Sequence, residues 1–203
     1  MGNYTLSGIP AGNYLMDFQA NGYISVLSRA VTVNAGAQTQ ANLSMSEALT
    51  TGTMRITLTW TNPMQGAVRD VDSYLAIPGV TNPLGFPYKG QSYYGATLDH
   101  DEINWVGPET ITINTLSNST YTYYVNNYSD RSSMTALGNS LVDITVYSGN
   151  NVLKEYKIPA GGNGRTFKVF QITAGVLVDV MQYDDTTPVY TEYRSGGVTL
   201  SGL

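Results

Sequence analysis

The chain has 203 residues, of which 42% are apolar and only 12% are charged, so it can form one large domain or two small ones. Its formal net charge of −5 argues against nucleic acid or an anionic membrane surface as partner, because both require a basic surface. The absence of cysteine excludes disulfides and thiol chemistry. No apolar run approaches the ~20 residues that span a bilayer, so membrane insertion is not expected.

Three short segments near the N-terminus alternate apolar and polar residues and are separated by glycine turns. They cover residues 14–20, 30–33 and 38–45, with Asn21-Gly22 and Asn34-Ala-Gly36 between them. Period-two patterning bounded by such turns is typical of antiparallel hairpins. We therefore expect a small β domain over residues 1–46.

A second and longer β region follows a linker at residues 47–53. Residues 54–60 place Met54, Leu58 and Trp60 on one face of a strand. Further strands are predicted at residues 72–77, 110–113, 120–128, 141–147, 151–158 and 166–173. The predicted fold class is all-β: an antiparallel, jelly-roll-like β-sandwich over residues 54–185, with a C-terminal tail or strand over residues 186–203.

Residues 6–23 and 31–43 carry a first family resemblance. They include Leu6-Ser-Gly-Ile-Pro-Ala-Gly-Asn-Tyr14 and Val31-Thr-Val-Asn-Ala-Gly36. These motifs resemble the second half of a carboxypeptidase regulatory-like domain, which is a transthyretin-like β-sandwich found as an accessory module beside enzymes or adhesins. The opening strands of that family are absent here. The resemblance therefore implies a small, incomplete transthyretin-like sandwich.

A second resemblance runs from about residue 54 to residue 173. Its motifs are Leu58-Thr-Trp60, Asp70-Val-Asp-Ser-Tyr74, Leu98-Asp-His-Asp101 and Gly107-Pro-Glu-Thr-Ile111. They resemble a family of uncharacterised extracellular bacterial β-sandwich domains with Asp-x-Asp and Gly-Pro-Glu motifs. The Asp-x-Asp arrangement is also similar to the pre-peptidase C-terminal type of domain, which in some members holds calcium. The resemblance implies an extracellular or cell-surface location.

Acidic residues of the second region are spaced so that they can converge. Asp70 and Asp72 project from the same face of a strand, Asp99 and Asp101 repeat that spacing, and Glu109 follows. If their loops meet, these five carboxylates would repel one another unless a hard cation such as Ca²⁺ joined them. The residues alone equally allow solvated loop acids that cap turns. The family resemblance favours the calcium site.

A long loop at residues 78–98 is rich in proline, glycine and tyrosine. Tyr88, Tyr93, Tyr94 and Trp105 could form a platform on which sugar rings stack. The other interpretation is that the tyrosines only pack within the fold. A carbohydrate-binding accessory module, with surface polysaccharide as partner, is therefore the alternative function.

Catalysis has little support in the sequence. His100 is the only histidine and lies between two aspartates, but no nucleophile motif accompanies it, so we interpret it as a surface residue. A metal-dependent or two-carboxylate hydrolase is the third hypothesis. We expect a non-catalytic, extracellular structural or adhesion module stabilised by calcium.

The end of the chain echoes its beginning. Val198-Thr-Leu-Ser-Gly-Leu203 resembles Tyr4-Thr-Leu-Ser-Gly-Ile9. The echo is expected if the chain is one unit of a repeat array or fibre, or if a terminal strand is donated to a neighbouring copy. Chance similarity within a restricted set of residue types is the other explanation.

Overall fold

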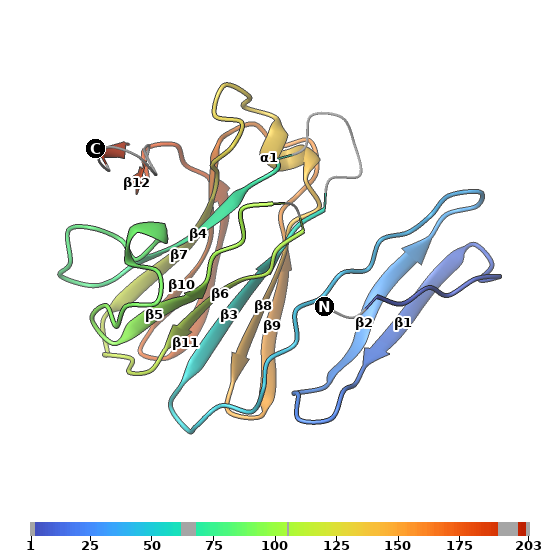
Figure 1. Cartoon of the computed structure of the whole chain (residues 1–203), viewed down its shortest axis with the longest axis horizontal. Coiled ribbons are helices and arrows are strands. Elements are labelled where there is room, and N and C mark those ends of the chain that lie inside the picture. Colours follow the sequence, from blue (N-terminus) through green and yellow to red (C-terminus); the bar gives the residue numbers. More distant parts are fainter. Residues whose placement is uncertain (1–2, 62–67, 105, 191–198, 202–203) are drawn as a thin grey trace.

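The computed structural model describes residues 3–61, 68–104, 106–190 and 199–201. Two antiparallel sheets face each other and form a β-sandwich, so the predicted all-β class is confirmed (Figure 1). The five-stranded sheet has the order β5-β6-β3-β8-β9, formed by Ala96–His100, Glu109–Ile113, Met54–Thr59, Asp143–Ser148 and Asn151–Lys157. The four-stranded sheet has the order β11-β10-β7-β4, formed by Val176–Tyr183, Thr166–Thr173, Thr120–Asn127 and Val71–Ala76.

The core between the sheets consists of the inward residues of alternating strands. Ile56 and Leu58 on β3 and Trp60 directly after it are buried there, as their spacing predicts. Phe170 of β10 stacks against Tyr123 and Tyr156, with ring centroids 5.1 and 5.0 Å apart. Aromatic stacking therefore joins the two sheets as well as neighbouring strands.

Side-chain hydrogen bonds connect the two sheets on both sides of the sandwich. On one side, Asp179 of β11 accepts hydrogen bonds from Lys154 and Tyr156 of β9, at 2.7 and 3.0 Å. On the other side, Glu109 at the start of β6 accepts a hydrogen bond of 2.5 Å from the backbone N–H of Ser73 on β4. This second edge contains the acidic residues.

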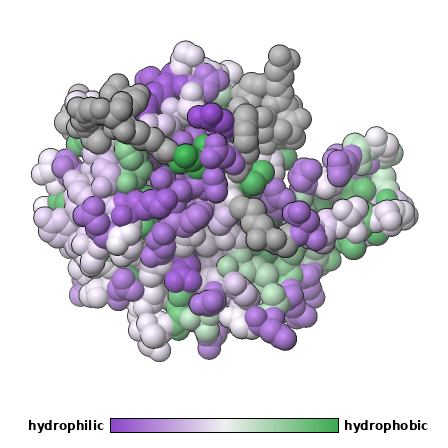
Figure 2. Space-filling model, viewed as in Figure 1, coloured by the Kyte–Doolittle hydropathy of each residue, from purple (hydrophilic) through white to green (hydrophobic). Residues whose placement is uncertain are grey.

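The N-terminal part forms a two-stranded sheet of β1 (Gly12–Phe18) and β2 (Val26–Val33) beside the sandwich (Figure 1). Val26 packs against Tyr147 on the outer face of the five-stranded sheet. The buried Arg29 forms an ion pair with Asp143, at 2.9 Å. Figure 2 shows apolar residues gathered over this hairpin.

The strand predicted at residues 38–45 is not formed, and that prediction is wrong. The segment instead crosses the outer face of the five-stranded sheet. There the Ser44 carbonyl accepts hydrogen bonds from the Tyr147 and Thr57 hydroxyls, at 2.7 and 3.3 Å. The Ser44 carbonyl therefore accepts hydrogen bonds from side chains of the sheet, whereas in a strand it would accept one from the backbone of a neighbouring strand.

Two strands were not predicted from the sequence. β5 lies within the tyrosine-rich segment, and its register shifts between Leu98 and His100. β11 pairs with β10, and the register of this pairing shifts between Lys168 and Phe170 of β10. Such irregularities break the period-two alternation by which strands are recognised.

The remaining elements are short. They are the 3₁₀ helix η1 (Phe86–Tyr88), the helix α1 (Ala136–Asn139), β12 (Val189–Tyr190) and β13 (Leu200–Ser201). β12 pairs with β13 and packs against the outer face of the four-stranded sheet. Residues 198, 202 and 203 of the echo lie outside the described residues. Within the described ranges, no helix has the length and apolarity needed to cross a bilayer.

Candidate metal centre

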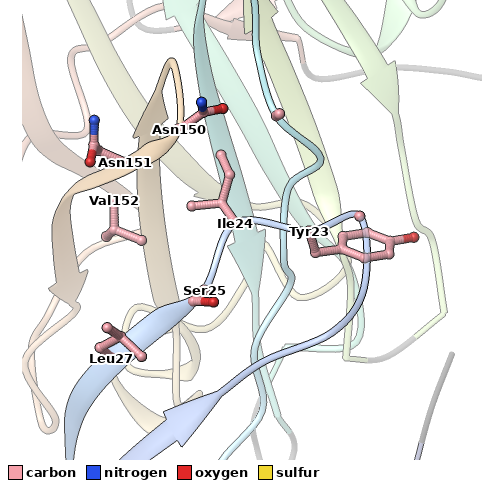
Figure 3. Close-up of a pocket in the computed structure, with 9 residues that line it drawn as sticks. Tyr23, Ile24, Ser25, Leu27, Asn150, Asn151 and Val152 are labelled. Carbon is pink, nitrogen blue, oxygen red and sulfur yellow. The ribbon is translucent and has the colours of Figure 1, made fainter.

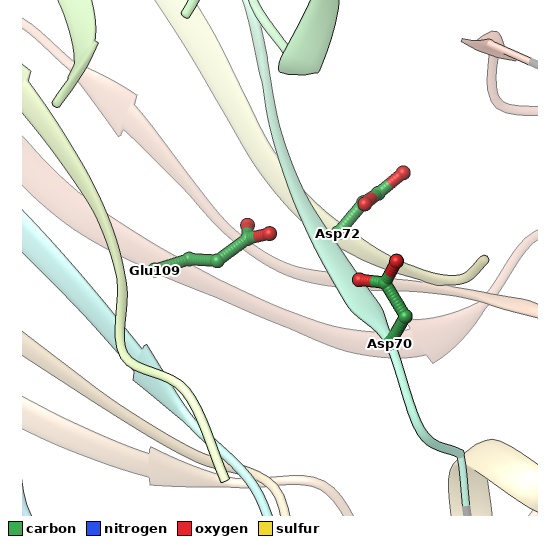
Figure 4. Close-up of side chains that lie close together, drawn as sticks. All are labelled: Asp70, Asp72 and Glu109. Atoms are coloured by element: carbon green, nitrogen blue, oxygen red, sulfur yellow. The ribbon is translucent and has the colours of Figure 1, made fainter. Parts of the chain in front are cut away.

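Three carboxylates meet where the start of β6 faces β4, the edge strand of the other sheet. Asp70 directly precedes β4 and Asp72 is the second residue of β4. Glu109 is the first residue of β6 (Figure 4). Glu109 shares the inward face of β6 with Ile111. β4 is the edge strand of its sheet, so Glu109 can reach the backbone N–H of Ser73 and the two aspartates beside it.

The Gly-Pro-Glu motif has a steric reason at this position. Gly107 has a positive φ of 72°, and a Cβ there would lie 2.8 Å from the Leu58 carbonyl oxygen and 3.0 Å from the Trp60 ring. Only glycine allows the chain to pass this close to β3 immediately before Glu109. The motif therefore brings the carboxylate to the sheet edge.

The three side chains are buried and very close together. One carboxyl oxygen from each of Asp70, Asp72 and Glu109 lies within 4.8 Å of the other two. The exposed fractions are 2%, 2% and 0%. Glu109 Oε2 is bonded to the Ser73 N–H, but Oε1 is buried without a hydrogen-bond partner among the described residues. A buried carboxylate oxygen that lacks a donor requires an explanation, and a proton or a bound cation would supply one.

The electrostatics of the cluster disfavour its fully ionised form. Burial, followed by the charges of Asp70 and Asp101, raises the pKa of Asp72 well above its usual range. Burial and the charges of Asp72 and Asp101 do the same to the pKa of Glu109. The positive charge of Arg131 lowers the pKa of Asp72 and offsets part of this effect. The cluster at neutral pH therefore needs protons or additional positive charge.

Asp101 is the fourth predicted acid in this region. Its charge acts on both Asp72 and Glu109, and its Oδ1 atom is buried without a hydrogen-bond partner. Lys89 lies nearby, with Nζ 3.1 Å from the Asp101 carbonyl oxygen and 3.7 Å from Oδ2. Asp101 thus stands beside the triad, with one oxygen available to a ligand.

Asp99, the fifth predicted ligand, is not part of the triad. It is exposed, and Oδ2 accepts a hydrogen bond of 2.5 Å from the Thr112 hydroxyl on the outer face of the five-stranded sheet. The register shift at this position explains why Asp99 and Asp101 do not share an environment. His100 is also exposed, and its Nε2 atom lies 3.9 Å from Glu102.

The donor set suits a hard divalent cation. Asp70, Asp72 and Glu109 would hold the ion, and the charge of Asp101 would add to its attraction. All are carboxylates, which is the chemistry that Ca²⁺ and Mg²⁺ prefer over nitrogen or sulfur ligands. The ion would neutralise the repulsion between these side chains and join the two sheets at this edge.

Sequence reasoning did not identify the residues that orient the carboxylates. The Tyr74 hydroxyl donates to Asp72 Oδ2 at 3.0 Å, and the Ser73 N–H donates to Glu109. One signal was available: Asp72 and Tyr74 are two residues apart on a strand and so share a face. The role of Ser73 depends on β4 being an edge strand, which the sequence does not reveal.

The tyrosine-rich loop does not form an open aromatic platform. The rings of Tyr88 and Tyr93 stack on each other with centroids 4.0 Å apart, and both pack against the core. Tyr94 is 68% exposed and meets Tyr93 edge-on. Trp105 lies outside the described residues. Among the described tyrosines of this loop, Tyr94 is the most exposed, and carbohydrate binding stays a prediction.

A cleft of about 600 Å³ separates the hairpin from the turn between β8 and β9. Ser25 and Leu27 line it from β2 and the residues before it, and Asn150 and Val152 line it from the turn (Figure 3). Tyr23 points away from Val152 in this view. The lining residues are uncharged, so the cleft has no ionic group with which to select a ligand.

Comparison with known proteins identifies no family. No protein-family model and no curated protein matches the chain. Among solved structures it is similar to SAV2460, which is described as a protein of unknown function. The sequences are 14% identical, the match covers 74% of this chain and 86% of SAV2460, and the TM-score is 0.45.

Proposed function

We propose that this protein is a non-catalytic structural module whose β-sandwich is stabilised by calcium bound at Asp70, Asp72 and Glu109. The observation that carries the proposal is the placement of three buried carboxyl oxygens within 4.8 Å of one another. Calcium at this position would replace repulsion by attraction between strands β4 and β6. Its effect would be to make the stability of the sandwich depend on the ion concentration.

The cellular setting follows from the same chemistry and is part of the proposal. Calcium sites of modest affinity, with Kd of about 10⁻⁴–10⁻³ M, are filled in the extracellular medium. We therefore place the module outside the cell or on its surface, as a spacer or adhesion unit. A repeat array or fibre built from such modules is the extension that the similar ends of the chain suggest.

Thermal unfolding of the chelator-treated chain during a calcium titration tests the proposal. Binding to the folded state alone at 100 times Kd contributes about 2.7 kcal/mol, which corresponds to a rise in Tm of roughly 5–10 °C for a chain of this size. The double variant Asp70→Asn/Asp72→Asn should lose this rise. Asp99→Asn removes a charge of the same type outside the triad and should retain it.

Isothermal titration with calcium and with magnesium measures the binding itself. We expect one site per chain in the wild type and none in the double variant. A wild-type chain whose Tm and heat signal do not respond to either ion would contradict the proposal. The carboxylates would then be held protonated in the folded protein.

A further inference from the structure

One side chain, that of Tyr74, connects the acidic site to the C-terminal strand β12. Asp72 Oδ2 accepts a hydrogen bond from the Tyr74 hydroxyl at 3.0 Å. The ring that carries this hydroxyl packs against the ring of Tyr190 in β12. The Tyr74 side chain therefore contacts both a carboxylate of the site and the terminal strand.

The seat of β12 is made of aromatic side chains on the outer face of the four-stranded sheet. The Tyr74 ring stacks on Tyr124 with centroids 5.4 Å apart and lies 6.0 Å from the Tyr190 ring. Val189 completes this buried cluster, and Leu200 of β13 packs against it. The position of the Tyr74 ring therefore determines how well the terminal strands fit.

Two further hydrogen bonds hold the terminal strand to the same region. The Tyr190 hydroxyl donates to the Pro83 carbonyl at 3.1 Å, and the Tyr124 hydroxyl donates to the Pro188 carbonyl at 2.6 Å. Gly85 approaches the Tyr74 ring so closely that a Cβ would lie 2.6 Å from it. The ring is thus enclosed on several sides, and Asp72 is the partner that an ion would fix.

We propose that ion binding at the acidic site controls the docking of β12, with Tyr74 as the positioning residue that connects them. The inference rests on the proposed calcium site. An ion that holds Asp72 by one oxygen leaves the other to accept the hydrogen bond of the Tyr74 hydroxyl, and this bond fixes the ring against which Tyr190 packs. Without the ion, Asp72 is either protonated or repelled by Asp70 and Asp101, so its carboxyl group is held less firmly and the seat is weaker.

The coupling must act in both directions. If calcium increases the stability of the docked strand by a given factor, docking increases calcium affinity by the same factor. Removal of the Tyr190 ring should therefore weaken calcium binding, although Tyr190 contributes no ligand. This reciprocity separates coupling from a general stabilisation of the sandwich.

Hydrogen exchange of the full chain, with and without calcium, tests the inference. We expect calcium to slow exchange of the amides of Thr187, Val189 and Tyr190 by roughly 5-fold or more. In Tyr74→Phe, which keeps the ring and removes only the hydroxyl, this gain should disappear while calcium still binds. The Kd of this variant for calcium should rise by no more than the factor by which calcium slows the exchange of β12 in the wild type. Tyr123→Phe is the matched control, because its buried hydroxyl bonds Ser73 Oγ instead.

Each result has a separate meaning. If calcium binds and the protection of β12 is the same in Tyr74→Phe as in the wild type, the coupling is refuted and the calcium site stands. If the wild type binds no calcium by titration, both proposals fail together. Should Tyr74→Phe not fold, Tyr190→Ala gives the second test, since an unchanged calcium Kd in that variant also refutes the coupling.

Discussion

The backbone N–H of Ser73 on β4 donates a hydrogen bond of 2.5 Å to Glu109 on β6. This bond spans the two sheets at the edge where the acidic triad lies. Glu109 therefore has two tasks: one oxygen closes the sandwich, and the other faces the aspartates. Substitutions that keep the first task and remove the second isolate the metal-binding role.

Glu109→Gln is the substitution that separates these tasks. The amide oxygen can still accept the Ser73 N–H, but one negative charge leaves the buried cluster. We expect a higher Tm than the wild type in calcium-free buffer, by roughly 2–4 °C per kcal/mol of relieved repulsion. Calcium should then produce a much smaller further rise, as measured by thermal unfolding. A calcium response equal to that of the wild type would remove Glu109 from the ligand set.

Stability without calcium should fall as the pH rises. The pKa values of Asp72 and Glu109 are raised in the folded chain, chiefly by burial, whereas both groups ionise near pH 4 when unfolded. The folded state therefore binds more protons above pH 4, and its stability decreases from there until the raised pKa values are passed. We expect the Tm of calcium-free protein to decrease between about pH 5 and pH 8, and saturating calcium to abolish this decrease. A Tm that rises over this range in calcium-free buffer would show that both carboxylates ionise without penalty.

Gly85→Ala tests how tightly the Tyr74 ring is held. The new Cβ would lie 2.6 Å from one ring atom of Tyr74 and 2.7 Å from another. Overpacking of a buried ring costs about 1–3 kcal/mol, so we expect a loss of that size in the free energy of unfolding by denaturant titration. Gly12→Ala is the control, because its Cβ would meet Tyr14 at an ordinary 3.4 Å. Equal effects of the two changes would show that the ring shifts freely.

The N-terminal hairpin should depend on Arg29 for its attachment. This buried side chain pairs with Asp143 at 2.9 Å and lies 3.5 Å from Glu155. Removing one member of a buried ion pair costs about 3 kcal/mol, so Arg29→Ala should release the hairpin and expose residues 34–53 to limited proteolysis. Lys157→Ala, which removes an exposed partner of Asp143, should leave the digestion pattern unchanged. Resistance of the Arg29→Ala chain to proteolysis would mean that apolar contacts alone hold the hairpin.

The sequence by itself determined the fold class and most of the strands, because alternation such as that of Met54, Ile56 and Leu58 depends only on the period of the pleat. It also selected Asp70, Asp72 and Glu109 as acids that could converge. The strand at residues 38–45 was predicted incorrectly, since local alternation does not reveal that the Ser44 carbonyl is taken by Tyr147. Bulges concealed β5 and β11 for a related reason.

Only the tertiary structure decided which acids share a site and what orients them. A shift of register in β5 turns Asp99 toward Thr112, while Asp101 stays beside the triad. The connection of Tyr74 to Tyr190 joins residues more than 100 positions apart in the chain. The physical reason is that strand order, register and edge position follow from the packing of the whole sandwich, and these place side chains that no local pattern relates.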